Sequence, residues 1–332
     1  MPKTSAGYTE PVKNFWKDLP RPFFVLAPLA NVTDAAFRRI IAKYSKPEGP
    51  HAMWTEFVSA DGLVLATPEG KEKLMRDLLY TEAERPVVAQ LFTSNPERME
   101  KAAALVQELG FDGLDINMGC PDRSIEKQGA GAKLITTPEV AVEVIAAAKR
   151  GAPNLPVSVK TRLGYNRDVL EDWLPKVLSA EPTAITVHAR TRKEMSKVDA
   201  HWERVKRAVE IRDSLQSPTL VLGNGDVKDI EDAQAKAATT GADGIMLGRA
   251  IFGTPWLFSG REAPALAKRL RIMVEHTKLF EELLGDIKSF AIMKKHFKAY
   301  VEGFDGAKEL RIKLMETENA AQVVRIVEDY LK

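Results

Sequence analysis

Residues 184–188 read AITVH, residues 87–92 read VVAQLF and residues 244–248 read GIMLG, and runs of this kind decide the fold. Parallel strands covered by helices are nearly continuous apolar runs, as these three are. Eight such runs follow residue 22, and the segments between them have apolar residues at helical spacing. Eight strands with intervening helices favour a closed TIM (β/α)8 barrel over an open doubly wound sheet. The predicted strands are 23–27, 52–56, 86–91, 113–117, 157–161, 184–188, 219–223 and 244–248.

Proline marks two of the predicted helix starts, and a helical segment follows the barrel. Asn95-Pro96 and Thr137-Pro138 each place a capping side chain before proline at the first helical position. From about residue 262 the strand-like runs stop, and LRIMVEHTKLFEELL at 270–284 has helical spacing. We therefore divide the chain into a leader (1–22), a barrel (23–261) and a small helical domain (262–332). The alternative is that the last helices are extra barrel helices.

Composition favours an ordinary cytoplasmic protein. Of the 332 residues, 45% are hydrophobic and 28% are charged, which is typical of globular chains. No apolar run approaches the roughly 20 residues that span a bilayer, and the start MPKTSAGYTE lacks the apolar core of a secretory signal. The single cysteine excludes an internal disulfide and fits a reducing compartment. The net charge of +2 gives weak support for an anionic partner. Nothing predicts a metal site, a membrane contact or an obligatory protein partner.

Polar residues stand at the ends of the predicted strands. In TIM barrels the catalytic residues lie there and on the loops that follow, because those loops converge above the packed interior. The residues expected around this mouth are Pro28, Gln90, Asn117 with Cys120, Lys160 with Arg162, His188 with Arg190, Asn224 with Asp226, and Gly248 with Arg249.

Strands seven and eight end in GNGD (223–226) and in Gly248-Arg249. Many barrels bind a phosphate there with backbone N–H groups. The guanidinium of Arg249 can add a pair of charge-assisted hydrogen bonds to that phosphate. Lys160 and His188 end adjacent strands, where a cation can stabilise negative charge on a reduced flavin ring. Each of these features has a purely structural alternative. GNGD can be only a turn, Lys160 can form an ion pair at the top of the barrel, and His188 can be a hydrogen-bonded core residue.

Two weaker candidates could also contact the flavin ring. Gln90 can offer its amide to a polar edge, and Pro28-Leu29-Ala30 can supply backbone contacts. A strand-end glutamine that only ties down a neighbouring loop is the alternative.

Cys120 lies on the loop after the fourth strand, followed by the glycine-containing SIEKQGAGAKLI (124–135). A thiol at the mouth can meet a bound substrate, whereas most lone cysteines are buried and inert.

Seven motifs, in order along the barrel, resemble those of the dihydrouridine synthase family of transfer-RNA-modifying flavoenzymes. The motifs are APLANVTDAAFR, VAQLFTSNPE, DINMGCP, VKTRLG, VHARTR, GNGD and GIMLGRAIFGTPWLF. The helical segment resembles the family's RNA-binding domain more loosely, through MKKHFKAYVEGF and ELRIKL.

The resemblance implies FMN as cofactor and NADPH, or NADH, as the electron donor. It implies Cys120 as the catalytic acid, with Asn117 and Arg162 holding the target uridine. The residues that it implies for FMN are Pro28, Leu29, Ala30, Gln90, Lys160, His188, Asn224, Gly225, Asp226, Gly248 and Arg249. Three positions depart from the family pattern: Leu29 replaces a methionine, Ser124 stands where lysine is frequent, and Ala189 replaces a glycine. The last two put details of RNA docking in doubt more than the flavin site.

The implied activity is reduction of the C5=C6 bond of uridine in tRNA. Hydride from reduced flavin would add at C6, and Cys120 would give a proton to C5, since a thiol of pKa about 8.5 is protonated at neutral pH. The base must first leave its stack, so phosphate contacts must offset that cost. The candidates are Arg190, Arg192, Lys193 and Lys197 beside the mouth, and Lys294, Lys295, His296 and Lys298 in the helical segment. The alternative is a solvated face, because acidic residues such as Glu194, Glu302 and Asp305 are close in sequence.

Two other functions stay open. The first is a flavin barrel that acts on a small molecule such as a free pyrimidine, as dihydroorotate or dihydropyrimidine dehydrogenases do. The second is a non-catalytic RNA-binding barrel.

Overall fold

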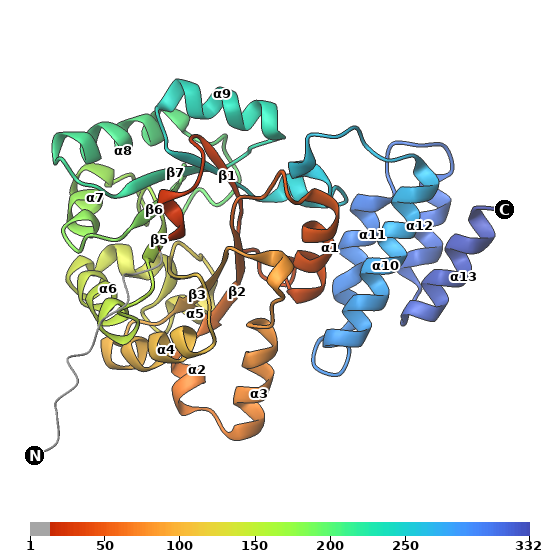
Figure 1. Cartoon of the computed structure of the whole chain (residues 1–332), viewed down its shortest axis with the longest axis horizontal. Coiled ribbons are helices and arrows are strands. Elements are labelled where there is room, and N and C mark those ends of the chain that lie inside the picture. Colours follow the sequence, from red (N-terminus) through yellow and green to blue (C-terminus); the bar gives the residue numbers. More distant parts are fainter. Residues whose placement is uncertain (1–13) are drawn as a thin grey trace, which may run out of the picture.

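Eight parallel strands close into a barrel in the order of the sequence, which confirms the predicted TIM barrel. The structure is a computed structural model, and it describes residues 14–332 (Figure 1). The predicted leader therefore lies partly outside the described residues. The strands are β1 (Phe23–Leu26), β2 (Met53–Ser59), β3 (Val87–Phe92), β4 (Gly113–Met118), β5 (Val157–Arg162), β6 (Ala184–His188), β7 (Leu220–Asn224) and β8 (Gly244–Leu247).

Each predicted run overlaps one strand, and β2 departs most from its predicted bounds. It extends three residues beyond the expected end at residue 56, through a register irregularity between Trp54 and Phe57. The β1–β2 seam is short, since these strands pair at one position, Leu26 opposite Met53.

Helices surround the barrel. They are α1 (Ala35–Ser45), α2 (Ala60–Leu65), α3 (Pro68–Asp77), α4 (Pro96–Glu108), α5 (Arg123–Glu126), α6 (Pro138–Gly151), α7 (Leu170–Leu178), α8 (Trp202–Ser214) and α9 (Ile230–Thr240). Single-turn 3-10 helices are η1 (Phe15–Lys17), η2 (Glu82–Glu84), η4 (Arg249–Ile251), η5 (Leu257–Ser259) and η6 (Phe290–Ile292), and η3 (Gly131–Thr136) is longer.

The two proline-marked helix starts behave differently. Asn95 caps α4, because its side chain accepts from the backbone N–H of Arg98 at 2.9 Å. The predicted cap at Thr137 is wrong. Helix α6 does begin at Pro138, but the hydroxyl of Thr137 turns back toward the carbonyl of Leu134 instead of accepting from the helix.

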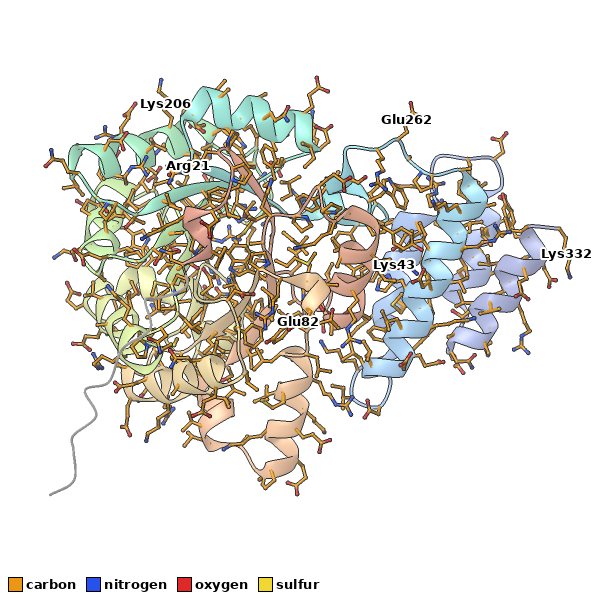
Figure 2. All side chains as sticks on the ribbon, in the orientation of Figure 1. Arg21, Lys43, Glu82, Lys206, Glu262 and Lys332 are labelled. Carbon is orange, nitrogen blue, oxygen red and sulfur yellow. The ribbon has the colours of Figure 1, made fainter. Side chains whose placement is uncertain are left out.

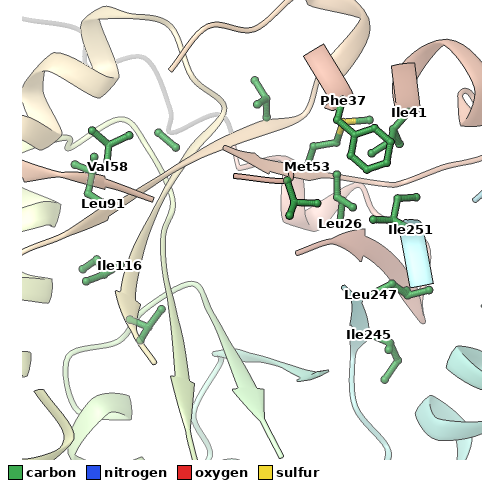
Figure 3. Close-up of a cluster of buried hydrophobic side chains, with 14 of the residues drawn as sticks. Leu26, Phe37, Ile41, Met53, Val58, Leu91, Ile116, Ile245, Leu247 and Ile251 are labelled. Carbon is green, nitrogen blue, oxygen red and sulfur yellow. The ribbon is translucent and has the colours of Figure 1, made fainter. Parts of the chain in front are cut away.

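The apolar core has two large parts and a small third cluster of Phe92, Ile125 and Ala130. Between the strands and the surrounding helices lie Leu26, Met53, Leu91, Ile116 and Leu247, with Phe37 and Ile41 of α1 (Figure 3). A second cluster contains Phe23, Trp54 and Met246 together with Phe15 and Trp16 of η1. Trp16 is 2% exposed, and its ring lies 5.9 Å from that of Trp54. The described end of the leader is thus part of the core.

Four further helices follow the barrel strands, and the first of them packs against α1 (Figure 1). They are α10 (Leu266–Leu284), α11 (Met293–Tyr300), α12 (Ala307–Met315) and α13 (Ala320–Tyr330). Lys43, labelled on α1 in Figure 2, pairs with Glu275 of α10 at 2.5 Å. The extra helices are as expected, and the domain boundary at residue 262 stays a prediction.

Across residues 14–332, no helix combines the length and the apolar character that a membrane span requires.

Candidate active site

A cavity of about 980 Å³ opens at the carboxyl ends of the strands. Every site residue predicted on the barrel lines it, which brings together segments far apart in the sequence. These residues are Pro28, Leu29, Ala30, Gln90, Asn117, Cys120, Lys160, Arg162, His188, Arg190, Arg192, Lys193, Lys197, Asn224, Gly225, Asp226, Gly248 and Arg249. Lys294, Lys295 and Lys298 are not among its lining residues.

The β7 and β8 ends form one corner of the cavity, and close packing requires a glycine there. Gly225 has φ +130, and a Cβ added there would lie 2.9 Å from the Cβ of Ala200. Asp226 accepts hydrogen bonds from Arg190 and Arg249. Burial opposes its ionisation, but these arginines hold its pKa below the usual value. The guanidinium of Arg249 is largely exposed, so it can also reach an anion in the cavity.

Cations crowd the cavity wall and change the protonation of their neighbours. Burial lowers the pKa of Lys160 to about 8, and the positive charge of Arg162 adds to this effect. Burial and the charges of Arg162 and Lys160 hold the pKa of His188 well below 6.5. His188 is therefore neutral at pH 7, and the positive field comes from the lysine and the arginines. Such a wall suits an anionic ligand.

Cys120 faces this cavity on a loop that is fixed at several points. Its backbone N–H donates to Oδ1 of Asn117 at 2.9 Å, and its carbonyl accepts from the N–H of Ala132 at 2.9 Å. Gly131 is required beside it, because a Cβ there would lie 2.7 Å from the Cys120 carbonyl oxygen. Burial raises the pKa of the Cys120 thiol, so the thiol is protonated at neutral pH.

The predicted phosphate-binding arginines at the mouth already have partners. Arg190 is 2% exposed and donates to Asp226 and to the carbonyl of Val198. Arg192 forms a two-pronged ion pair with Glu126 of α5. Its guanidinium also lies 5.3 Å from the centre of the Tyr165 ring. Both arginines therefore shape the mouth before any ligand arrives.

Two features of the site escaped sequence reasoning. Arg123 lines the cavity directly after the Cys120 motif, and its place in that loop was the available signal. Asp115 lies below the cavity floor, fully buried, and accepts from Gln90 at 2.6 Å. All six residues of β4 are buried, and the partners of Asp115 come from β3 and β5.

The four predicted phosphate contacts of the helical segment, Lys294, Lys295, His296 and Lys298, lie on different faces of α11. Lys295 and Lys298 are exposed and Lys294 is half-buried. His296 is wrong as a phosphate contact, because it is 0% exposed and packs against Phe37. It shares the buried face with the apolar residues of α11, at helical spacing.

Comparisons with known proteins identify the family. The dihydrouridine synthase (Dus) family matches residues 25–332. A probable tRNA-dihydrouridine synthase of Staphylococcus aureus strain COL is 39% identical over 321 residues, which are 96% of each chain. Probable tRNA-dihydrouridine synthase 2 of Bacillus subtilis strain 168 is 40% identical over 321 residues, 96% of this chain and 97% of that protein.

The solved structures show the fold alone. A 6-hydroxypseudooxynicotine amine oxidase from Pseudomonas geniculata N1 aligns with a TM-score of 0.53 at 14% identity, over 80% of this chain and 53% of that one. A 2-naphthoyl-CoA reductase complex aligns with a TM-score of 0.51 at 10% identity, over 70% of this chain and 49% of that one. On the sequence matches, the chain belongs to the dihydrouridine synthase family of enzymes.

Proposed function

We propose that this protein is an FMN-dependent tRNA-dihydrouridine synthase, which reduces the C5=C6 bond of uridines in tRNA. The observation that carries the proposal is a protonated thiol in a cation-lined cavity at the barrel mouth. The names of the relatives, which match over almost their full lengths, support the same substrate. A tRNA substrate and a single cysteine support a cytoplasmic location.

The cavity has the residues that an FMN phosphate and ring would need. Gly225 lines the cavity and Arg249 supplies an exposed guanidinium, so GNGD and Gly248-Arg249 would hold the phosphate. Lys160 and neutral His188 would lie along the ring, with Asn224, Asp226, Gln90 and Pro28-Leu29-Ala30 completing the site. When bound and reduced by NADPH or NADH, FMN supplies the hydride for C6 of the uracil.

The protein's own residues bring the base and a proton to that reaction. Asn117 and Arg162 flank Cys120 and would hold the flipped uridine. The Cys120 thiol would donate its proton to C5 as hydride reaches C6, and its raised pKa keeps that proton available at neutral pH. Lys160 and Arg162 stabilise negative charge that develops on the uracil.

The test is Cys120→Ala. We expect this variant to bind FMN and to accept electrons from NADPH as the wild type does, but to reduce uridine in full-length tRNA at least about 100-fold more slowly, because one general acid is lost. Dihydrouridine formed per minute measures the tRNA reaction, and bleaching of the flavin absorbance measures its reduction. Thr136→Ala, an exposed change on η3, is the matched control. Unchanged turnover in Cys120→Ala would remove the thiol from the mechanism.

The same two measurements separate the rival functions. A small-molecule reductase would oxidise reduced flavin with free pyrimidine and not with tRNA. A non-catalytic RNA-binding barrel would bind tRNA without forming dihydrouridine.

A further inference from the structure

A chain of three buried polar side chains begins at Asp115, below the cavity, and continues through two cavity-lining residues toward Cys120. Asp115 and Asn117 lie on β4 and Gln90 lies on β3, and all three are 5% exposed or less. The amide nitrogen of Gln90 donates to Oδ2 of Asp115 at 2.6 Å, and the amide nitrogen of Asn117 donates to Oε1 of Gln90 at 3.1 Å. Oδ1 of Asn117 then accepts from the backbone N–H groups of Gly119 at 3.1 Å and Cys120 at 2.9 Å.

The two ends of this chain fix its direction. Burial raises the pKa of Asp115 to about 6, so the carboxyl is ionised at neutral pH. An ionised carboxylate only accepts hydrogen bonds, and a backbone N–H only donates them. The Gln90 amide must therefore turn its nitrogen toward Asp115 and its oxygen toward Asn117. Asn117 must in turn point its nitrogen at Gln90 and its oxygen at the two backbone N–H groups. Flipping either amide would place two donors or two acceptors face to face in a buried site, which is costly.

We propose that Asp115 is a positioning residue for Cys120, acting through Gln90 and Asn117. This inference rests on the proposed role of Cys120 as proton donor. The carboxylate sets the orientation of both amides, and the second amide holds the first turn of the loop that carries the thiol. All four polar atoms of the two amides thereby take part in holding the loop, and each amide nitrogen keeps one N–H for FMN or uridine.

Other contacts of the loop do not replace this link. Arg162 donates to the carbonyl of Gly119 at 2.7 Å, and Ala132 donates to the carbonyl of Cys120. These hold the carbonyl side of the loop, whereas Asn117 holds its N–H side. The remaining partner of Asp115 is the Ser158 hydroxyl, which donates to Oδ1. Ser158 therefore anchors Asp115 without taking part in the chain toward Cys120, which makes it a matched control.

Because Cys120 is the only cysteine of the sequence, its alkylation can be followed without interference. The experiment measures the rate of iodoacetamide modification against pH, on the FMN-loaded protein without tRNA. Asp115→Ala should release Gln90 and Asn117, loosen the loop and expose the thiol. A fall of about one unit in the apparent pKa of the thiol would raise the alkylation rate about tenfold below that pKa. Asn117→Ala should give a similar rise, and the double variant should add little, because both changes break one chain.

Two variants should behave as the wild type does. Ser158→Ala leaves the chain intact. Asp115→Asn can still accept from Gln90 with its amide oxygen, provided that its nitrogen turns toward the Ser158 hydroxyl. Wild-type alkylation in Asp115→Asn would show that Asp115 acts by positioning the amides, and that its negative charge is not needed. If Asp115→Ala does not fold, Gln90→Leu breaks the chain while leaving Asp115 bonded to Ser158, and the same rise is expected.

An alkylation rate and pH profile unchanged in Asp115→Ala, or in Gln90→Leu, would overturn the proposal. So would an additive double variant, because the two residues would then act separately. The outcome is independent of whether Cys120 is the acid. The alkylation rate reports the position of the thiol, whereas the Cys120→Ala assay reports its role in the reaction.

Discussion

At the scale of single residues, Asp34 is a buried carboxyl with a structural role. One of its oxygens caps α1 by accepting from the N–H of Phe37 at 2.9 Å, and the other has no hydrogen-bond partner among residues 14–332. Burial raises the pKa of Asp34 to about 7, and the nearby charge of Glu56 adds to this effect. The folded protein therefore holds a proton there that the unfolded chain releases.

Asp34→Asn should stabilise the protein increasingly as the pH rises. The pKa of Asp34 is about 7 when folded and near 3.8 when unfolded, so its favourable contribution is complete below about pH 4 and is lost as the pH rises to about 7. The amide cannot ionise and still caps the helix. The difference in unfolding free energy, variant minus wild type, should grow by up to about 1.4 kcal/mol per pH unit in that range. Urea unfolding at several pH values measures it.

Asp229→Asn is the control, since it makes the same change at the exposed cap of α9. A difference for Asp34→Asn that stays constant from about pH 4 to about pH 7 would contradict a buried, protonated carboxyl.

At the scale of elements, α11 shows how one helix can serve two purposes. Met293, His296, Phe297 and Tyr300 form its buried face, while Lys295 and Lys298 face solvent. Lys298 also borders a second cavity, shared with Lys308 and Arg311 of α12. Glu302 and Glu316 line the same cavity, so the surface carries both signs of charge. We propose that its cations meet RNA phosphates.

Lys298→Glu should weaken tRNA binding and flatten its dependence on salt. Loss of one phosphate contact reduces the slope of log affinity against log salt by about one, and charge reversal adds repulsion. Filter binding at several salt concentrations measures both. Lys206→Glu is the control, because Lys206 lies exposed on α8, far from α11 in Figure 2. Equal effects of the two variants would indicate net charge alone, without a contact at α11.

The sequence predicted the positions of the strands better than the contacts that individual side chains make. The eight strands follow from local apolar runs, and strand ends brought the barrel residues to one cavity. The side of α11 on which His296 lies depends on α1 and α10, which a list of nearby lysines does not reveal. Likewise, the pairing of Arg192 with Glu126 joins loops 66 residues apart. The residues that ended in ion pairs or in the core were those whose partners lie far along the chain.

At the scale of the whole molecule, a buried histidine pair joins the barrel to the later helices. His276 of α10 and His296 of α11 have ring centres 4.6 Å apart, and Phe37 of α1 packs against both. None of the four ring nitrogens has a hydrogen-bond partner among residues 14–332. Burial lowers the pKa of His296 to about 3 and that of His276 well below 6.5, so both are neutral in the folded protein.

His296→Phe should make the protein less sensitive to acid. The unfolded histidine takes a proton near pH 6.5 and the folded one near pH 3, so stability falls as the pH drops through that range. Removing one such group should reduce the slope by up to about 1.4 kcal/mol per pH unit. Phenylalanine also removes two unpaired buried nitrogens. Urea unfolding at about pH 7.5 and about pH 5 measures the change.

His201→Gln, at a partly exposed histidine beside Glu194, is the control. If the unfolding free energy of His296→Phe falls with pH as steeply as that of the wild type, the contact between the histidine pair and Phe37 must open before the protein unfolds.

The contact between α1 and α10 bears on how this protein can diversify. Strands β1 and β2 meet at one register position, and the helix that follows β1 has its outer face covered by α10. The later helices therefore act as an outer wall of the barrel as well as a separate surface. Exchange of these helices for an unrelated module would uncover the face of α1 that packs against α10. We therefore expect new preferences among partners to arise by surface substitution and not by recombination of whole parts.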